Sequence, residues 1–350
     1  HRIARRQRQM CIRDRSRVVG FANWNSEIGW GQVDVDDAGN IITAGSFEDS
    51  IDFQHGPGEF YMASAGLGYT NDIYVAKLNA NGGFLWATHF GHSDEEYLRD
   101  MLVDDDGNIY LTGTFEAITD LDPGPGSQIH TTSGDYGGFL VKLNSNGQLI
   151  WAHGFANNGL FYPACLALGS DGSIYCGGGF SDAVDFDPGP GVNLVTPTTN
   201  EQGFVAKYDS AGNLMWAQRY GEVQSIALDS LDNLHIAGRF TGWVDFDPGP
   251  GVDAHVAGSS PFWDNYVVKQ DSARAFLWAR TWQGHTTWID EIMVDQVGNL
   301  HIVGAFKADD TDFDPGPGFH QVSPTTYYEN DPFWLQLYPN GNFKLLRTWG

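Results

Sequence analysis

The sequence predicts an all-β fold, a β-propeller of four-stranded antiparallel blades, and three observations lead to this prediction. A unit of about 65 residues recurs five times between residues 26 and 350. Each unit holds four short apolar segments, which are separated by turns rich in glycine and asparagine. No segment has the 3.6-residue period of an amphipathic helix. Repetition of a small four-stranded sheet is typical of propellers, in which each sheet packs between two neighbours.

Each repeat opens with a predicted hairpin of two strands, A and B. The hairpin reads LVDDDGNIYLTGTF in the second repeat and MVDQVGNLHIVGAF in the fifth. Its D-x-x-G-N turn supplies residues that accept the left-handed backbone of a tight turn. Strand B is apolar in a nearly continuous run, so we expect both faces of the sheet to be buried. Every strand B ends in a phenylalanine that we assign to the core: Phe47, Phe115, Phe180, Phe240 and Phe306.

An acidic, glycine-rich loop follows strand B in every repeat. It reads DFQHGPG from residue 52, DLDPGPG from residue 120 and DFDPGPG from residues 185, 245 and 312. Carboxylates two residues apart, with glycine carbonyls nearby, suit a hard cation such as Ca²⁺. The alternative is structural: the carboxylates pair with lysines, and Pro-Gly-Pro-Gly forms a rigid turn. The candidate residues are Asp120, Asp122, Asp185, Asp187, Asp245, Asp247, Asp312 and Asp314.

The second half of each repeat is a predicted hairpin of strands C and D, as in FVAKYDSAGNLMWAQRY. Strand C carries a lysine at one position in four repeats, which favours a repeated Lys–Asp pair in so acidic a chain. Strand D carries tryptophans spaced by 65, 65 and 62 residues, which we expect to pack between blades, and the fifth repeat has Leu345 instead. These structural repeat residues are Lys77, Lys142, Lys207, Lys269, Trp86, Trp151, Trp216 and Trp278.

Composition and charge argue against several classes of partner. The chain has 19 basic and 44 acidic residues, and its formal net charge is −25. Such a surface repels phosphate backbones, so no nucleic acid partner is expected. No run of 18 apolar residues occurs, so no membrane span is predicted. Cys165 and Cys176 lie on neighbouring strands of one hairpin, either as a disulfide or as two buried thiols.

The first 17 residues differ from the rest of the chain, with seven arginines and one acidic residue. Within them, MCIRDRS resembles the translated sequencing-adapter peptide found at the ends of environmental gene assemblies. The segment lacks the apolar core of a signal peptide. We therefore predict that residues 1–17 are a non-native, disordered extension, and that residues 18–350 form one propeller domain. Its expected blades are residues 26–92, 93–155, 156–221, 222–284 and 285–350.

The recurring D-x-x-G-N-x-Y-x-x-G-x-F hairpin, the D-F-D-P-G-P-G loop and the F-V-A-K-L-N-x-x-G hairpin resemble the SBBP family. This family comprises the β-propeller repeats of secreted and surface-attached bacterial proteins, and the resemblance covers residues 26–350. The sequence departs from the pattern at Gln54-His55 and at Arg274. The resemblance implies seven blades and an extracellular or cell-surface protein with further domains. The five repeats are therefore a fragment of a seven-bladed propeller or, alternatively, a closed five-bladed ring.

The sequence contains no H-x-x-x-H, C-x-x-C or nucleophile-elbow motif, so it nominates no catalytic residue, although enzymatic activity stays open. We predict a non-catalytic extracellular binding or scaffold module, whose B–C and D–A connections meet a protein or glycan. One alternative is a propeller enzyme, a lyase or quinone-dependent oxidoreductase, with an active site assembled from several blades. Another is a spacer rigidified by Ca²⁺. The aromatic residues expected on the ligand face are Phe262, Trp263, Tyr327, Tyr328, Phe333 and Trp334.

Overall fold

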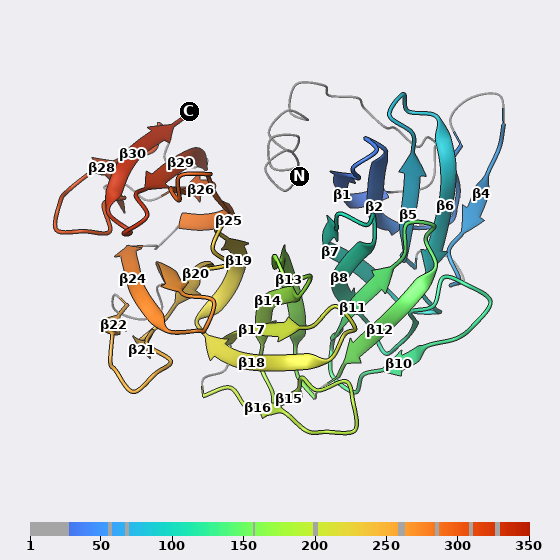
Figure 1. Ribbon diagram of the computed structural model, residues 1–350, viewed down its shortest axis with the longest axis horizontal. Coiled ribbons are helices and arrows are strands. Elements are labelled where there is room, and N and C mark those ends of the chain that lie inside the picture. Colours follow the sequence, from blue (N-terminus) through green and yellow to red (C-terminus); the bar gives the residue numbers. More distant parts are fainter. Residues whose placement is uncertain are drawn as a thin grey trace. The chain divides into compact units, whose positions relative to one another are not determined.

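The computed structural model describes residues 28–54, 58–66, 70–156, 158–198, 202–257, 263–283, 287–307, 311–325 and 330–350. Within these ranges the regular elements are all β-strands. The same ranges contain no helix of the length and apolarity needed to cross a membrane. The strands form repeated four-stranded antiparallel sheets, as the sequence predicts (Figure 1).

Each of these sheets contains strands A, B, C and D of one repeat, side by side in that order. The first two sheets consist of β1 (Ile28–Val35), β2 (Ile41–Phe47), β5 (Asp72–Leu78) and β6 (Phe84–Phe90), and of β7 (Glu96–Val103), β8 (Ile109–Phe115), β11 (Gly137–Leu143) and β12 (Leu149–Phe155). The third consists of β13 (Phe161–Leu168), β14 (Ile174–Phe180), β17 (Gln202–Tyr208) and β18 (Leu214–Tyr220). The remaining two consist of β19 (Glu222–Leu228), β20 (Leu234–Phe240), β23 (Asp264–Gln270) and β24 (Phe276–Gln283), and of β25 (Thr287–Val294), β26 (Leu300–Phe306), β29 (Asp331–Leu337) and β30 (Phe343–Thr348).

The turns between strands A and B have the backbone that their sequence requires. Gly107 has a φ of 78°, a left-handed conformation that glycine reaches without steric cost. In the fourth repeat Asp232 takes the glycine position at a φ of 58°, which aspartate tolerates better than most residues. The hairpins therefore keep one turn geometry although the turn residue changes.

The connection between strands B and C contains a short two-stranded ribbon that the sequence analysis did not predict. In each ribbon two short strands flank the acidic loop, so the loop forms the tip of a hairpin of its own. The ribbons pair β3 (Ser50–Asp52) with β4 (Tyr61–Ala63), β9 (Ile118–Asp120) with β10 (Ile129–Thr131), β15 (Val184–Asp185) with β16 (Leu194–Val195), β21 (Trp243–Asp245) with β22 (Ala254–Val256), and β27 (Thr311–Asp312) with β28 (Gln321–Val322).

The chain divides into two compact units, which are described separately. One comprises the chain to Pro163 with Asp182–Leu194 and Ala211–Asn213, and the other comprises Ala164–Ser181, Val195–Ser210 and Leu214–Gly350. In each unit the core lies between consecutive sheets. In the first unit, Val75 of the first sheet and Leu111 of the second belong to one buried cluster.

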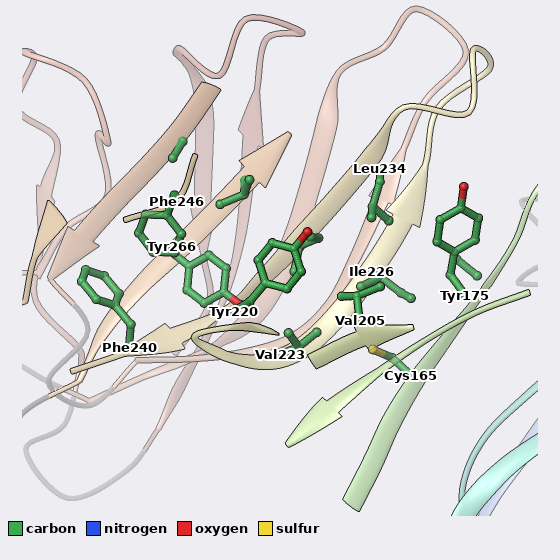
Figure 2. Packing of buried hydrophobic residues seen from close by; sticks show 14 of the residues in the cluster. Cys165, Tyr175, Val205, Tyr220, Val223, Ile226, Leu234, Phe240, Phe246 and Tyr266 are labelled. Atoms are coloured by element: carbon green, nitrogen blue, oxygen red, sulfur yellow. The ribbon is translucent and has the colours of Figure 1, made fainter. Parts of the chain in front are cut away.

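The second unit has the same organisation. Val205 of the third sheet and Ile236 of the fourth share one cluster, and Ala237 and Ile302 join the fourth sheet to the fifth in another. Figure 2 shows the first of these clusters, in which the rings of Phe246 and Tyr266 lie side by side, 4.8 Å between centroids. Within each unit, consecutive sheets thus bury apolar surface against each other, which is the main stabilising contribution to such repeats.

Candidate functional site

The lysines of strand C form ion pairs with aspartates of the A–B turns, which corrects the prediction that they pair with the D-F-D-P-G-P-G loops. Lys77 Nζ lies 2.9 Å from Asp36 Oδ2, and both side chains are buried. Lys269 Nζ lies 3.0 Å from Asp229 Oδ2, again with both side chains buried. The register explains the correction. Lys77 is opposite Ile42, which lies next to the A–B turn at the end of strand B remote from the acidic loop.

The aspartate of the A–B turn is held by the asparagine four residues later. Asp36 Oδ1 accepts the Asn40 backbone N–H at 2.8 Å, and Asp36 Oδ2 accepts the Asn40 side-chain amide at 2.8 Å. Burial alone would raise the pKa of Asp36, but the bonds from Asn40 and Lys77 lower it below its ordinary value, so the carboxylate stays charged. The same Asp–Asn arrangement recurs at Asp104 and Asn108, Asp229 and Asn233, and Asp295 and Asn299.

Two further repeats show other contacts at the lysine position. Lys142 Nζ lies 4.8 Å from the centroid of the Tyr110 ring, whose hydroxyl is 3.4 Å from Asp104 Oδ2. In the fifth repeat Gln336 replaces the lysine, and its side-chain amide lies 3.1 Å from Nε2 of His301. A neutral hydrogen-bonded group thus takes the place of the ion pair there.

The strand D tryptophans pack against the C–D turn of the following repeat. A Cβ added at Gly147 would lie 2.8 Å from a ring carbon of Trp86, and one added at Gly341 would lie 3.0 Å from Trp278. Trp278 also donates its indole N–H to the Pro339 carbonyl at 3.1 Å. The turn glycine is therefore required for close approach as well as for its backbone conformation.

Arg274 occupies the position of this turn glycine in the fourth repeat. Its φ is 69°, and its guanidinium group lies 5.1 Å from the centroid of the Trp216 ring. A cation over an indole ring is favourable and offsets part of the backbone strain. The departure of Arg274 from the repeat pattern thus keeps the tryptophan covered.

The D-F-D-P-G-P-G loops use their carboxylates to hold backbone amides. Asp120 Oδ1 accepts the N–H groups of Asp122 and Gln128 at 3.1 and 2.7 Å, and Asp122 Oδ1 accepts that of Gly124 at 2.8 Å. The same bonds recur at Asp185 and Asp187, Asp245 and Asp247, and Asp312 and Asp314. Calcium binding by these loops stays a prediction.

The residue between the two aspartates is buried, a role that the sequence analysis missed. It packs on the phenylalanine that ends strand B: the Phe240 and Phe246 rings are 5.3 Å apart, and the Phe306 and Phe313 rings 5.2 Å. The alternation of polar and apolar residues in D-F-D was the available signal, since it is the pattern of a strand with one buried face. This anchor fixes the base of each ribbon.

The ribbons expose large apolar side chains next to the acidic tips. The first residue after the Pro-Gly-Pro-Gly turn is exposed in three repeats, at 77% for Val192, 74% for Val252 and 73% for Phe319. Trp243 of β21 is exposed at 63%. Other exposed apolar residues of the ribbons are Phe60, Tyr61, Ile129, Leu194 and Val256. These residues form the candidate binding surface of each ribbon, which we call the ribbon surface.

The aromatic residues predicted on the ligand face have different environments. Phe333 is wrong as a ligand contact, because it lies in β29 and is buried in the core against Phe313. Trp334 stacks on His301, with 5.6 Å between ring centroids, and donates its indole N–H to that histidine. Trp263 lies under the guanidinium of Arg239 at 4.7 Å. Phe262, Tyr327 and Tyr328 lie outside the described residues.

The remaining candidates for chemistry are few. Cys165 and Cys176 are buried thiols and form no disulfide with each other, so the thiol alternative of the sequence analysis is the one observed. In the described ranges, no three or more His, Cys, Asp or Glu side chains gather as a metal-binding group. The recurring Lys–Asp and Trp–Gly contacts are structural, which leaves the ribbon surface as the candidate site.

Comparisons with known proteins give distant similarities. No family model matches the chain. It is similar to "Uncharacterized WD repeat-containing protein L264" of Acanthamoeba polyphaga mimivirus, with 28% identity over an alignment of 204 residues. This alignment covers 49% of the present chain. The chain is 25% identical over 173 residues, 46% of its length, to "Regulatory protein FlaEY" of Caulobacter vibrioides. The matches span 14% and 18% of these two relatives.

Among solved structures, the chain is similar to a protein of unknown function from Bacteroides caccae. The TM-score is 0.32 and the identity 11%, and the match covers 81% of this chain and 92% of that one.

Proposed function

We propose that this chain is a non-catalytic binding or scaffold module built as a β-propeller, and that it binds its ligand through the ribbon surface. The observation that carries this proposal is the exposure of Trp243, Val252 and Phe319 beside carboxylates at the ribbon tips. Exposed apolar groups rimmed by polar ones are typical of interaction sites. The similarity to a WD repeat-containing protein and to a regulatory protein supports a repeat scaffold.

The ribbon surface is favoured over the opposite ends of the sheets because of how the repeats vary. The A–B and C–D turns are occupied by the Asp–Asn, Lys–Asp and Trp–Gly contacts, each of which recurs in several repeats. The ribbons share their acidic loops but differ in the apolar residues that they expose. Variation at one end of a constant framework is the usual arrangement of a recognition surface.

The charge of the chain indicates what the ligand looks like. With a formal net charge of −25 and carboxylates in the D-F-D-P-G-P-G and D-L-D-P-G-P-G loops, the surface favours a partner with basic residues around an apolar patch. A protein supplies both, so a protein ligand is our first choice and a glycan the second. The resemblance to SBBP repeats supports an extracellular or cell-surface location. Binding is expected to weaken as the salt concentration rises.

The experiment uses a photo-cross-linking amino acid in place of Val252, and in a second protein in place of Leu231. Leu231 is a matched control, because it is exposed at 73% in an A–B turn. We expect cross-links to a specific protein from position 252 and not from position 231. A glycan array probed with the unmodified chain tests the second ligand class in parallel.

The partner identified by mass spectrometry is then purified and its Kd measured. The substitutions Trp243→Ser, Val252→Ser and Phe319→Ser together are expected to weaken binding at least about tenfold, because a few apolar anchors carry most of an interface's affinity. The control Met215→Ser, Leu231→Ser and Val297→Ser removes equally exposed residues outside the ribbons and should leave Kd unchanged. Equal losses from both sets would refute the ribbon surface.

A further inference from the structure

Two fully buried carboxylates meet where the first repeat passes into the second. Asp72 is the first residue of β5, and Glu96 is the first residue of β7. Both residues have no exposed surface. Gly91 follows β6 (Phe84–Phe90) and lies between the two side chains. All three residues belong to the same compact unit.

Each carboxylate has one oxygen that is hydrogen-bonded and one that is not. Asp72 Oδ2 accepts the Ala65 N–H at 3.0 Å, and Glu96 Oε1 accepts the His92 N–H at 3.2 Å. Asp72 Oδ1 and Glu96 Oε2 are buried and have no hydrogen-bond partner within the described part of the chain. A Cβ added at Gly91 would lie 2.6 Å from the first atom and 2.7 Å from the second. Both orphaned oxygens therefore face one small space, which exists because residue 91 is glycine.

A third oxygen lies beside one of these carboxylates. The hydroxyl of Thr119, in β9 (Ile118–Asp120), is fully buried. It interacts with the Glu96 carboxyl group and lowers the pKa of that group. A neutral oxygen ligand is therefore available next to Glu96.

The local charges make the same point. His89 Nε2 lies 3.6 Å from Asp72 Oδ2, but burial lowers the pKa of this histidine, which favours its neutral form. No lysine or arginine of the described residues forms an ion pair with either carboxylate. Burial raises the pKa of Asp72 to about 7 and that of Glu96 to about 9, and the charge of Asp72 adds to the second shift. Buried carboxylates are otherwise paired or bound to a metal.

Two carboxylates at equivalent positions in other repeats are satisfied by the protein itself. Glu222, which begins strand A of the fourth repeat, accepts two hydrogen bonds from Arg239, at 2.7 and 3.1 Å. Asp331, which begins strand C of the fifth repeat, accepts the N–H and the hydroxyl of Thr325 at 2.7 and 3.2 Å. The orphaned oxygens at Asp72 and Glu96 therefore distinguish this site from those two carboxylates, although the buried hydroxyl of Thr287, the counterpart of Glu96 in the fifth repeat, also has no partner among the described residues.

We propose that Asp72 and Glu96 bind a hard divalent cation of the Ca²⁺ type in the space beside Gly91, with the Thr119 hydroxyl as a neutral oxygen ligand. Two carboxylates balance the charge of such an ion, and oxygen is its preferred ligand atom. Backbone carbonyls and water supply the remaining ligands. Because Asp72 belongs to the first repeat and Glu96 and Thr119 to the second, the ion joins two consecutive repeats.

The test starts from the full chain treated with a chelator at pH 7.5. Isothermal titration with CaCl₂ is expected to show one site per chain that Asp72→Asn and Glu96→Gln each abolish. Bound Ca²⁺ should raise Tm by about 5 °C at a hundred times Kd, because it stabilises the folded state alone. The control Asp331→Asn changes the equivalent residue of the fifth repeat and should keep both the titration and the Tm shift.

Gly91→Ala provides a second variant, because it keeps both carboxylates while its methyl group fills the space. If it folds with native circular dichroism and has lost Ca²⁺ binding, the location of the ion is supported. Three outcomes overturn the proposal: no Ca²⁺ response in the unmodified chain, a response kept in both carboxylate variants, or a response lost only when Asp120→Asn alters an acidic loop.

Discussion

The first and third repeats place a lysine at the same position of strand C and surround it differently. Lys77 and Asp36 are both 9% exposed and 2.9 Å apart, and Lys77 also donates to the Ser145 carbonyl at 3.3 Å. In the third repeat, Lys207 lies 3.4 Å from Asp171, whose side chain is 56% exposed. One position in the repeat therefore holds a buried ion pair in one copy and a solvated one in the other.

The difference originates in a single residue of the A–B turn. Gly169 occupies the position that is aspartate at residues 36, 104, 229 and 295, so no carboxylate is available there. Asp171, two residues later, takes over the lysine and accepts the N–H of Ser173 at 3.0 Å. Its position at the tip of the turn exposes it to water. Burial of the ion pair thus depends on where in the turn the carboxylate lies. Burial in turn determines how much the pair contributes to the free energy of unfolding.

The largest expected effect is that of Lys77→Met. Removing one partner of a buried pair leaves Asp36 charged and without its counter-ion, so the free energy of unfolding should fall by about 3–5 kcal/mol. Urea denaturation followed by tryptophan fluorescence measures it. A loss below about 1 kcal/mol would place this pair with ordinary surface ion pairs and remove the contrast between the two repeats.

The fourth repeat, whose Lys269–Asp229 pair is also buried, adds a pH-dependent effect through His235. This histidine is fully buried on strand B, opposite Lys269 of strand C. The equivalent residue of strand B is not a histidine in the first three repeats. Burial first, and the charge of Lys269 second, lower the pKa of His235 to about 4, although Asp229 acts in the opposite direction. The unfolded chain therefore binds a proton below pH 6.5 that the folded chain does not bind until about pH 4.

The contribution of neutral His235 to the free energy of unfolding is present above about pH 6.5, and it is lost as the pH falls from 6.5 towards 4. Between pH 7 and pH 5 the loss should be roughly 2 kcal/mol. His235→Tyr, which restores the residue found as Tyr110 and Tyr175, should remove this component of the pH dependence. His301→Tyr is the control, since His301 lies 3.3 Å from Asp295 and is only partly buried. An identical pH profile for His235→Tyr and the unmodified chain would contradict the assignment.

These contrasts show what the sequence could predict. The strands and their order followed from turn chemistry and from apolar runs, and they are confirmed. The repeated lysine correctly indicated a Lys–Asp pair. Aspartates occur both in the acidic loops and in the A–B turns, however, and the prediction chose the loops instead of the turns. Counting along the hairpins would have placed Lys77 beside the C–D turn, at the same end of the sheet as the A–B turn and Asp36.

Other features could not be predicted, because they depend on contacts between repeats. Asp72 and Glu96 are 24 residues apart on different sheets, and neither belongs to a motif. Their proximity becomes visible only when Gly91 brings the two repeats together. Phe333 was assigned to a loop because the start of strand C is hard to locate in FWLQL, where every second residue faces the core. Strand boundaries are the least reliable part of such an analysis.

A transplant of the buried arrangement into the third repeat should have an intermediate effect. The variant combines Gly169→Asp, Asp171→Ala and Ser173→Asn, which reproduces the turn that contains Asp36 and Asn40. All three changes are needed, because a Cβ at Gly169 would lie 2.7 Å from Asp171 Oδ1. We expect the free energy of unfolding to rise by about 1–2 kcal/mol, as improved turns and charge placement commonly achieve. An unchanged or lower urea midpoint would mean that the third repeat cannot bury the pair.

The smallest expected effect is that of Lys207→Met, the counterpart of the first substitution. The pKa of Lys207 is raised: burial would lower it, but the Tyr175 hydroxyl and Asp171 outweigh burial. Because Asp171 is largely hydrated, it needs no counter-ion, and the loss in unfolding free energy should be below about 1 kcal/mol. The methyl group of methionine replaces the lysine stem over the Tyr175 ring, where Nζ lies 4.8 Å from the centroid. If Lys207→Met reduced the free energy of unfolding as much as Lys77→Met, exposure of the carboxylate would not determine the strength of the ion pair. The contact between the lysine cation and the tyrosine ring would then be the stronger one. This contact occurs at Lys142 and at Lys207.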